Sequence, residues 1–430
     1  MCVPYVSTAL RAVVAIILIG TLLPAQDPAR AGAAVTLTID DALAQATQVS
    51  PALAAAREQL RAAEGRARQA SAFANPSFSF QREQTSGSGA ENSQNIITID
   101  QPIELGLRRA RRDAADRRRA AAAERLRDAE SLIAFEVTRA FARALAADRR
   151  AELANEAAAA FARAQRVSDE RLAAGDISGY ANRRIRLEAS RYAALRAEAI
   201  LAQRTARLEL HALIALPDDR RDVDALRLAA IAERPASNLA VDSLLSLAAA
   251  NRGDLAAARL DADAAAADAT LASRERIPTP VFTAGVKTEM ISGVGDLNGF
   301  AAGVVLPLPL WDRSRGAIAA AVATGRARDA EVAQLRRRVE FEVRDAVAAA
   351  RAVDAQVSAL EFSLGAESTL ALRAVETAYA EGEIPLIEWL DAVRAYHEAE
   401  ATFASLRAES HIRRAALDRA IGLPLRRSVQ

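Results

Sequence analysis

The segment Ala174-Gly175-Asp176-Ile177-Ser178 recurs 207 residues later as Glu381-Gly382-Glu383-Ile384-Pro385, and this pair of segments decides the fold. Each segment follows a long, charged, alanine-rich stretch with helical periodicity, and another such stretch follows it. Because glycine readily adopts the left-handed conformation that ends helices, Gly175 and Gly382 are expected to break the helical pattern. The sequence therefore predicts the turn of a helical hairpin at two places in the chain.

Four further pairs of segments repeat in the same order, which indicates that the chain contains two copies of one unit. The pairs are residues 50–57 and 252–259, 76–78 and 280–282, 101–103 and 306–308, and 214–217 and 421–424. Their offsets are 202, 204, 205 and 207 residues, so the spacing drifts little. Five matching pairs in register are hard to obtain by chance, and we interpret them as an internal duplication.

Both copies are expected to contain a helix, a β-hairpin, a very long helix and a further helix. Thr38 can cap the first helix, with Asp41 at its third position. The first repeat, 34–217, is predicted to have a helix at 38–73, a β-hairpin at 77–101, a long helix at 107–173 and a helix at 179–215. The second repeat, 237–424, is predicted to have a helix at 239–275, a β-hairpin at 281–306, a long helix at 313–380 and a helix at 386–421. Residues 218–236 are interpreted as a linker and residues 425–430 as a C-terminal tail.

The composition excludes several classes of protein. The 430 residues are 51% hydrophobic, but much of this is alanine and only 4% of the chain is aromatic, which suits closely packed long helices better than a thick globular core. The formal net charge is +1, so no global field attracts nucleic acid and no nucleic-acid partner is expected. Since neither a glycine-rich phosphate loop nor a histidine paired with a nucleophile can be recognised, we expect no enzyme activity and no cofactor.

Residues 1–31 are predicted to be a cleaved signal peptide. Arg11 precedes an apolar run, 12–23, which is too short to span a bilayer as a helix, and Pro24 and Pro28 follow it. An uncleaved anchor is the alternative. Cys2 is the single cysteine and precedes the apolar run, so the exported chain would contain no disulfide or thiolate metal site. We expect no transmembrane helix after this segment.

The predicted hairpins alternate apolar and polar residues. Phe78 and Phe80 alternate with serines, and Phe282, Ala284 and Val286 alternate with polar or small residues. Period-two segments of about ten residues are typical of outer-membrane barrel strands, and a small soluble sheet that caps the helices would have the same pattern. Because open sheet edges are not tolerated in hydrocarbon, the membrane interpretation requires several chains to close a barrel. Three chains would supply twelve strands and six two-helix ribbons.

These features together resemble the TolC-type outer-membrane efflux channel family, and within it the heavy-metal (CzcC-like) branch. The resemblance extends from residues 37–43 to residues 421–424, nearly the whole exported chain. Its most specific segment is Tyr-Ala-Glu-Gly-Glu-Ile-Pro-Leu-Ile-Glu-Trp-Leu-Asp-Ala at 379–392, and Gln-Pro-Ile-Glu-Leu-Gly-Leu-Arg-Arg at 101–109 also carries it.

The resemblance implies a mainly α fold with a small β part. Long α-helical hairpins would form a trimeric α-barrel, and four strands per chain would contribute to a twelve-stranded β-barrel. The homotrimer would lie in the cell outer membrane, contact outer-membrane lipid and extend into the periplasm. It would act as a passive exit duct, with heavy-metal cations as the expected cargo. Its partners would be a periplasmic adaptor (membrane fusion protein) and an inner-membrane pump of the resistance-nodulation-division type.

The resemblance also implies two kinds of site near the hairpin turns. Glu388 and Asp391, three residues apart on one helix face, fall where the family places acids that ring the closed periplasmic entrance. Ala181 occupies the position of Glu388 in the first repeat, so the paired acids occur in the second repeat alone. Adaptor docking is expected at the two turns, through Gly175, Asp176, Ile177, Ser178, Gly382, Glu383, Ile384 and Pro385.

Two other motifs are given structural interpretations. His211, His397 and His411 have no second histidine at metal-site spacing, so we expect a structural or solvated role and no metal site. The arginine-rich stretch 108–119 is interpreted as a solvated helix face, with contact to lipid phosphates as the alternative.

Two other functions stay open at this point. A periplasmic adaptor also contains long helical hairpins, but it would carry several β domains. A soluble coiled-coil scaffold would wash off membranes, whereas a duct would fractionate with the outer membrane as a heat-modifiable trimer.

Overall fold

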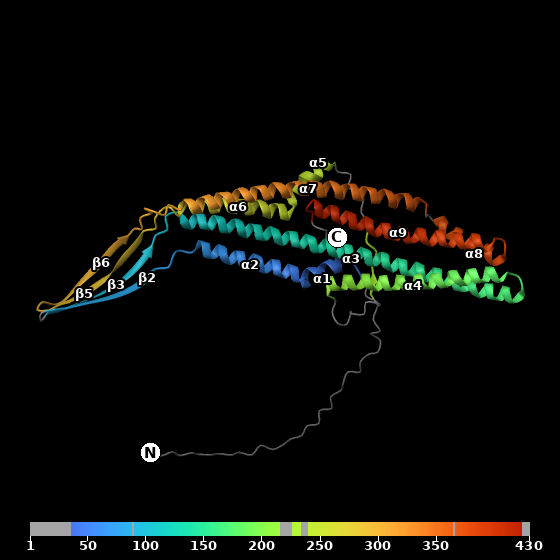
Figure 1. Cartoon of the computed structure of the whole chain (residues 1–430), viewed down its shortest axis with the longest axis horizontal. Helices are drawn as coiled ribbons and strands as arrows, with labels where there is room; N and C mark the ends of the chain where they lie inside the picture. The colour runs from blue at the N-terminus through green and yellow to red at the C-terminus, as the bar shows by residue number, and fades with distance from the viewer. Residues whose placement is uncertain (1–35, 88–89, 216–225, 234–239, 364–365, 424–430) are drawn as a thin grey trace, which may run out of the picture. The chain divides into compact units, whose positions relative to one another are not determined.

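The computed structural model describes residues 36–87, 90–215, 226–233, 240–363 and 366–423. The predicted signal peptide, the C-terminal tail and most of the predicted linker lie outside these residues. The helices are α1 (Ile39–Val49), α2 (Pro51–Ser71), α3 (Leu107–Ala174), α4 (Gly179–Ile214), α5 (Val241–Asn251), α6 (Gly253–Arg274), α7 (Arg315–Ser363), α8 (Ala366–Glu381) and α9 (Leu386–Ala420). The strands are β1 (Thr36–Leu37), β2 (Ser77–Gly87), β3 (Ala90–Pro102), β4 (Arg227–Leu228), β5 (Val281–Ile291) and β6 (Gly295–Val305). The predicted fold class, mainly helical with a small β part, is confirmed (Figure 1).

The first helical segment of each repeat is two helices, so the single helices predicted at 38–73 and 239–275 are wrong. In the first repeat Ser50 caps α2 by accepting the N–H of Leu53 at 3.4 Å, and Pro51 is the first residue of α2. A serine followed by a proline favours the start of a helix. The serine hydroxyl accepts a backbone N–H of the first turn, and proline fits the first helical position because the N–H of that residue would have no acceptor within the helix. In the second repeat α5 ends before Arg252 and α6 begins at Gly253.

The N-terminus of α1 has the cap that the sequence indicates. The Thr38 hydroxyl accepts the N–H of Asp41 at 3.1 Å, and the Thr38 N–H donates to the Asp41 carboxylate at 3.2 Å. This reciprocal arrangement satisfies two backbone donors at the start of α1.

The long helices form a layer with two free edges. α4 packs against α3, α3 against α9, and α9 against α7, so α4 and α7 lie on opposite sides of the layer (Figure 1). The 68 residues of α3 extend about 100 Å at 1.5 Å per residue. The long helix predicted at 313–380 includes residues 364–365, which lie outside the described residues, and α7 and α8 flank them.

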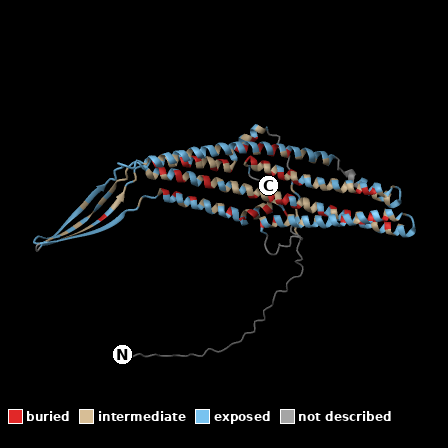
Figure 2. Ribbon diagram, in the orientation of Figure 1, coloured by how far each residue is buried: buried red, intermediate tan, exposed pale blue. Residues whose placement is uncertain are grey.

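Two hydrophobic cores are built from corresponding residues of the two repeats, each from one short helix, the long helix and the last helix. The first contains Ala42, Ala46, Ile133, Val137, Leu210 and Ile214. The second contains Leu244, Ala248, Val339, Val343, Leu417 and Ile421. Buried residues lie between the helices, whereas most of the sheet is exposed (Figure 2). The two repeats of the sequence therefore pack their helices in the same way, with core residues at equivalent positions.

The strands pair in the order β2-β3-β5-β6, and the antiparallel β3–β5 pair joins the two repeats. Gly285 of β5 lies so close to β3 that a Cβ atom would overlap the carbonyl oxygen of Ile97. The register aligns Phe78, Ile99, Ala284 and Ala302 across the sheet, and the next row aligns Phe80, Ile97, Val286 and Phe300. The alternating residues thus form one apolar face, on which Phe300 is 86% exposed.

A second, two-stranded pairing was not predicted. β1 pairs in parallel with β4, which lies within the segment interpreted as a linker. Each of these strands has two residues, too few for a period-two pattern to be recognisable.

Candidate functional site

The two predicted hairpin turns have the same backbone geometry. Gly175 and Gly382 follow α3 and α8 in the left-handed conformation, with φ of 84° and 81°. The N–H of Asp176 donates to the carbonyl of Arg171 at 2.9 Å, and the N–H of Glu383 donates to the carbonyl of Ala378 at 2.8 Å. These bonds satisfy the last carbonyls of both helices, and a side chain at either glycine would be strained.

The residues after the glycines differ between the repeats. Ser178 caps α4 by accepting the N–H of Ala181 at 3.2 Å, whereas Pro385 precedes α9 without a side-chain cap. Asp176, Glu383 and both glycines are exposed, while Ile177 and Ile384 are half-buried. The structure thus brings the predicted docking residues together into two compact turns.

Glu388 and Asp391 lie on the exposed side of α9, in its first two turns. Trp389, Leu390 and Val393 fill the opposite side of the helix and are buried. The acids therefore share one face, as their spacing predicts, and are free to point away from the chain's own core. An acid in the first turn of a helix is also favoured by the helix dipole.

An aromatic cluster joins the two hairpins just beneath these acids. Trp389 of α9 is 3% exposed and lies between Phe161 of α3 and Tyr379 of α8, with ring centroids 5.1 Å apart in both pairs. Tyr192 of α4 stacks on Phe161 at 4.1 Å. This cluster was not predicted from the sequence, although aromatic residues make up only 4% of the chain and three of them meet here with Tyr379.

An ion pair crosses between the hairpins beside the aromatic cluster. Arg394 of α9 approaches Glu188 of α4 at 3.2 Å, and Arg191 lies 3.7 Å from the second oxygen of Glu188. Burial acts against the charge on Arg394, but Glu188 and the hydroxyl of Tyr192 raise its pKa above the ordinary value. The tips of the two repeats are thus held together by both ring contacts and a partly buried charge pair.

The first repeat has a polar network where the second has Trp389. Asn182 is 2% exposed and donates to the Ser168 hydroxyl at 3.1 Å and to the Asp169 carboxylate at 2.7 Å. Arg186 also pairs with Asp169 at 2.9 Å. The hydrogen bonds from Asn182 and Arg186 lower the pKa of Asp169. The two turns are therefore alike in backbone and different in the side chains beneath them.

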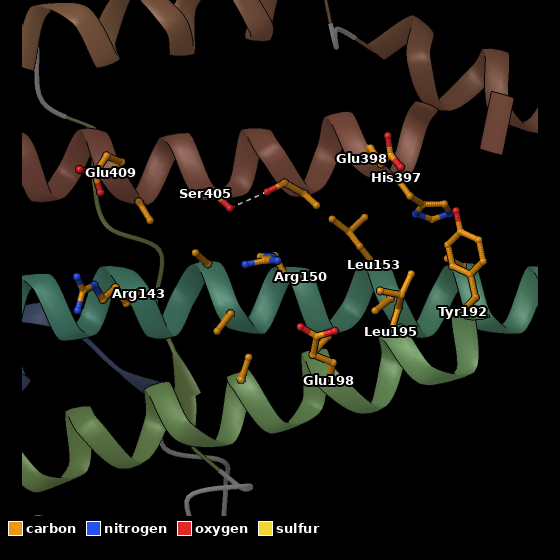
Figure 3. A pocket seen from close by; sticks show the side chains of 18 of the residues that line it. Arg143, Arg150, Leu153, Tyr192, Leu195, Glu198, His397, Glu398, Ser405 and Glu409 are labelled. Atoms are coloured by element: carbon orange, nitrogen blue, oxygen red, sulfur yellow. Dashed lines mark hydrogen bonds between the residues drawn. The ribbon is translucent and has the colours of Figure 1, made fainter. Parts of the chain in front are cut away.

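A cavity of about 590 Å³ opens between α3, α4 and α9, next to the aromatic cluster. Figure 3 shows charged side chains of both signs around it, including Arg150, Glu198 and Glu398. His397 also lines the cavity. Burial of its imidazole, and to a smaller extent the positive charge of the nearby Arg149, lower the pKa of His397. Among the described residues, no group of three or more His, Cys, Asp or Glu side chains could hold a metal ion.

The arginine-rich start of α3 contacts neighbouring helices. Arg117 pairs with Asp263 of α6 at 3.1 Å, and Arg118 and Arg125 pair with Asp268 and Asp261 of the same helix. These arginines are about half exposed, so each pair contributes little to stability. The interpretation of this stretch as a merely solvated face therefore missed its contacts with α6.

Within the residues described, every helix is either too short or too polar to span a lipid bilayer.

Comparison with known proteins gives a consistent result. Residues 42–215 and 244–423 match the family described as outer membrane efflux protein, so both repeats are covered. The chain is 27% identical to the cobalt-zinc-cadmium resistance protein CzcC of Cupriavidus metallidurans, over 91% of each chain. It is 29% identical to the nickel and cobalt resistance protein CnrC of the same species, over 71% of each chain.

A solved structure supports the fold. The outer membrane protein VceC of Vibrio cholerae superposes with a TM-score of 0.71 at 20% identity, covering 90% of this chain and 97% of that one. Because the family match includes both repeats, the chain belongs to the outer membrane efflux protein family and is an efflux channel of the outer membrane that extends into the periplasm.

Proposed function

We propose that this chain forms the exit duct of a tripartite efflux system that releases heavy-metal cations from the cell. The cargo is proposed from the two similar proteins, which are described as conferring resistance to cobalt, zinc and cadmium and to nickel and cobalt. An adaptor or scaffold role fits less well, because the family match covers both repeats of an efflux channel.

One observation carries the proposal: the four-stranded sheet has a continuous apolar face, and β2 and β6 lie at its two ends without a further partner among the described residues. An apolar face of this kind is stable against lipid, but unpaired backbone groups are not. Pairing of β6 with β2 of the next chain would satisfy both edges. Three chains would give twelve strands, so we propose a homotrimer whose apolar face contacts outer-membrane lipid.

At the other end of the long helices, Glu388 and Asp391 would line the closed periplasmic entrance. Three chains would place six carboxylates around one axis, and their mutual repulsion would weaken the closed state while favouring cations over anions. Since Ala181 replaces the first acid in the other repeat, this charge would have three-fold symmetry. The residues 175–178 and 382–385 would meet the tips of a periplasmic adaptor, which would connect the duct to an inner-membrane pump of the resistance-nodulation-division type.

The entrance is tested by Glu388→Gln combined with Asp391→Asn in planar bilayers. We expect lower leak conductance, because the repulsion among the carboxylates that weakens the closed state is removed, and weaker cation preference, because the charges that attract cations are removed as well. Glu58→Gln on α2, which removes an exposed acid far from the turns, is the control. Unchanged conductance and selectivity would contradict the role of these acids in the entrance.

The cargo is tested separately, with a strain that lacks the gene. We expect higher sensitivity to zinc, cobalt and cadmium, restored by the wild-type chain, with little change for hydrophobic drugs. Sensitivity to drugs alone would refute the metal cargo and leave the efflux channel intact.

A further inference from the structure

Charge is distributed unevenly along the helical layer, although the formal net charge is only +1. Figure 1 shows the ends of α2 and α6 and the starts of α3 and α7 next to the sheet. We call the four stretches that connect these helices to the strands the basic band, which consists of residues 65–75, 103–113, 270–280 and 306–316. The basic band contains ten arginines and four acids. The two turns at the other end of the helices, residues 171–181 and 378–391, contain one arginine and five acids.

Two arginines of the basic band hold the chain itself together. Arg111 donates to the Glu104 carboxylate at 2.9 Å and to the carbonyl of Ala70 at 3.1 Å. Arg108 donates to the carbonyl of Ser71 at 2.5 Å. Both side chains therefore satisfy carbonyls at the end of α2 and fasten the start of α3 to it.

Seven other arginines of the basic band have no such role. Their side chains are exposed, and none of them makes a hydrogen bond or an ion pair with another residue in the part of the chain that the structure describes. Three belong to the first repeat, Arg66, Arg68 and Arg109, and four belong to the second, Arg274, Arg276, Arg313 and Arg315. Guanidinium groups gathered at one end of the molecule repel one another, and an anionic partner would offset this repulsion.

Exposed apolar residues lead from the sheet into the basic band. Residues 306–311 follow β6 with the sequence Leu-Pro-Leu-Pro-Leu-Trp, and the three leucines and the tryptophan are exposed. The two prolines have no N–H that would need a partner in lipid. Arg313 and Arg315 come next. The chain thus passes from aliphatic side chains to an aromatic ring and then to guanidinium groups, which is the order of environments from the core of a bilayer leaflet to its phosphates.

We propose that the basic band binds the phosphate groups of anionic phospholipids in the leaflet that faces the periplasm. Two observations identify phospholipid as the occupant: the unpaired guanidinium groups complement phosphate, and the band is continuous with the apolar face of the sheet. A guanidinium can donate two parallel N–H groups to one phosphate. This inference rests on the proposed lipid contact of the sheet, and it adds the class of lipid and the residues that select it.

The test uses the fluorescence of Trp311, which lies within the basic band. Trp389, the second tryptophan, is replaced by phenylalanine so that Trp311 is the single emitter. The purified full chain is reconstituted in phosphatidylcholine vesicles that contain a brominated lipid, either phosphatidylcholine or the anionic phosphatidylglycerol, because bromine quenches tryptophan on contact. We expect the apparent affinity of the anionic lipid for the site at Trp311 to be higher by about five-fold for each arginine that it contacts. Added salt should reduce this preference.

A four-residue variant removes the unpaired arginines nearest to Trp311, by Arg274→Gln, Arg276→Gln, Arg313→Gln and Arg315→Gln. We expect its preference for the anionic lipid to fall to about one, because these side chains are the phosphate ligands. The matched control removes the same charge from exposed arginines of α3 and α4 near the first turn, which also make no hydrogen bond or ion pair through their side chains among the described residues: Arg163→Gln, Arg166→Gln, Arg183→Gln and Arg184→Gln. This control should keep the wild-type preference.

Four results would overturn the inference: equal affinity of the wild-type chain for both lipids, a wild-type preference in the variant of the basic band, an equal loss in the control, or loss of the preference when inorganic phosphate is added at constant ionic strength. The last result would indicate a site for the free ion. In all four cases lipid still quenches Trp311, and the proposed channel stands. Absence of quenching by either lipid would instead contradict the lipid contact of the sheet, which belongs to the proposed function.

Discussion

Trp389 is expected to contribute most to holding the two hairpins together beneath the entrance. Its side chain is 3% exposed and contacts rings from α3 and α8. Replacing a buried tryptophan with alanine costs about 3–5 kcal/mol, from lost burial and the cavity left behind. Each ring contact is worth about 0.5–1.5 kcal/mol beyond burial, which places Trp389→Ala in the upper part of that range.

The chain provides its own control, because it contains two tryptophans. Trp311 is 91% exposed, so Trp311→Ala is expected to cost less than about 0.5 kcal/mol in the isolated chain. Thermal unfolding of the purified protein in detergent, followed by circular dichroism, measures both. We expect Trp389→Ala to lower the midpoint by about 5 °C or more, with a much smaller shift for Trp311→Ala.

The functional consequence is measured in planar bilayers. A weaker contact between the hairpins should raise leak conductance in Trp389→Ala, and Trp389→Phe, which retains a ring, should lie between this variant and the wild type. Equal shifts in midpoint for the two alanine variants would refute the argument, because burial is what distinguishes the two side chains.

Two further predictions follow from close packing and from titration. Gly253→Ala should destabilise the protein by about 1–3 kcal/mol, because the new Cβ would lie 2.7 Å from a carbonyl oxygen of α3. Gly65→Ala, where no atom lies within 4 Å of the new Cβ, should instead stabilise helix α2 by up to about 1 kcal/mol. Chemical denaturation measures both changes in the free energy of unfolding, and changes of the same sign would contradict the role of the close contact at Gly253. Burial and the neighbouring Arg149 lower the pKa of His397 below its ordinary value of 6.5, so the unfolded chain binds the proton more readily and stability is lost as the pH falls below about 6.5. The thermal midpoint of His397→Gln should therefore fall less than that of the wild type between pH 7.5 and 5.5, and parallel curves would contradict this assignment.

Local chemistry was sufficient to predict the hairpin turns. Gly175 and Gly382 adopt positive φ because the last helical carbonyls need N–H partners that a left-handed residue brings within reach. The cap at Thr38 likewise depends on residues three positions apart. The break at Ser50 is equally local, but helical periodicity continues on both sides of it and hides the signal of a serine followed by a proline.

The candidate entrance was only partly accessible from the sequence. The spacing of Glu388 and Asp391 is enough to place them on one helix face, and the structure has them exposed there. Their role in the entrance stays a proposal, as do the docking roles of the turns. The contacts beneath them were not predictable, since Phe161, Tyr192 and Trp389 are far apart in the chain and meet because of how α3, α4 and α9 pack.

The duplication, the helical and extended segments and the glycine turns can be predicted from the sequence, because they depend on periodicity and on neighbours within a few residues. Which faces of these elements meet depends on how the whole chain packs. The tertiary structure aligned the alternating residues of four strands into one apolar face, and it buried Ala142 of α3 while leaving the equivalent Ala348 of α7 exposed. Two residues at equivalent positions of the repeats can therefore differ in burial. Burial depends on which element packs against the residue, and residues close in sequence do not determine that element.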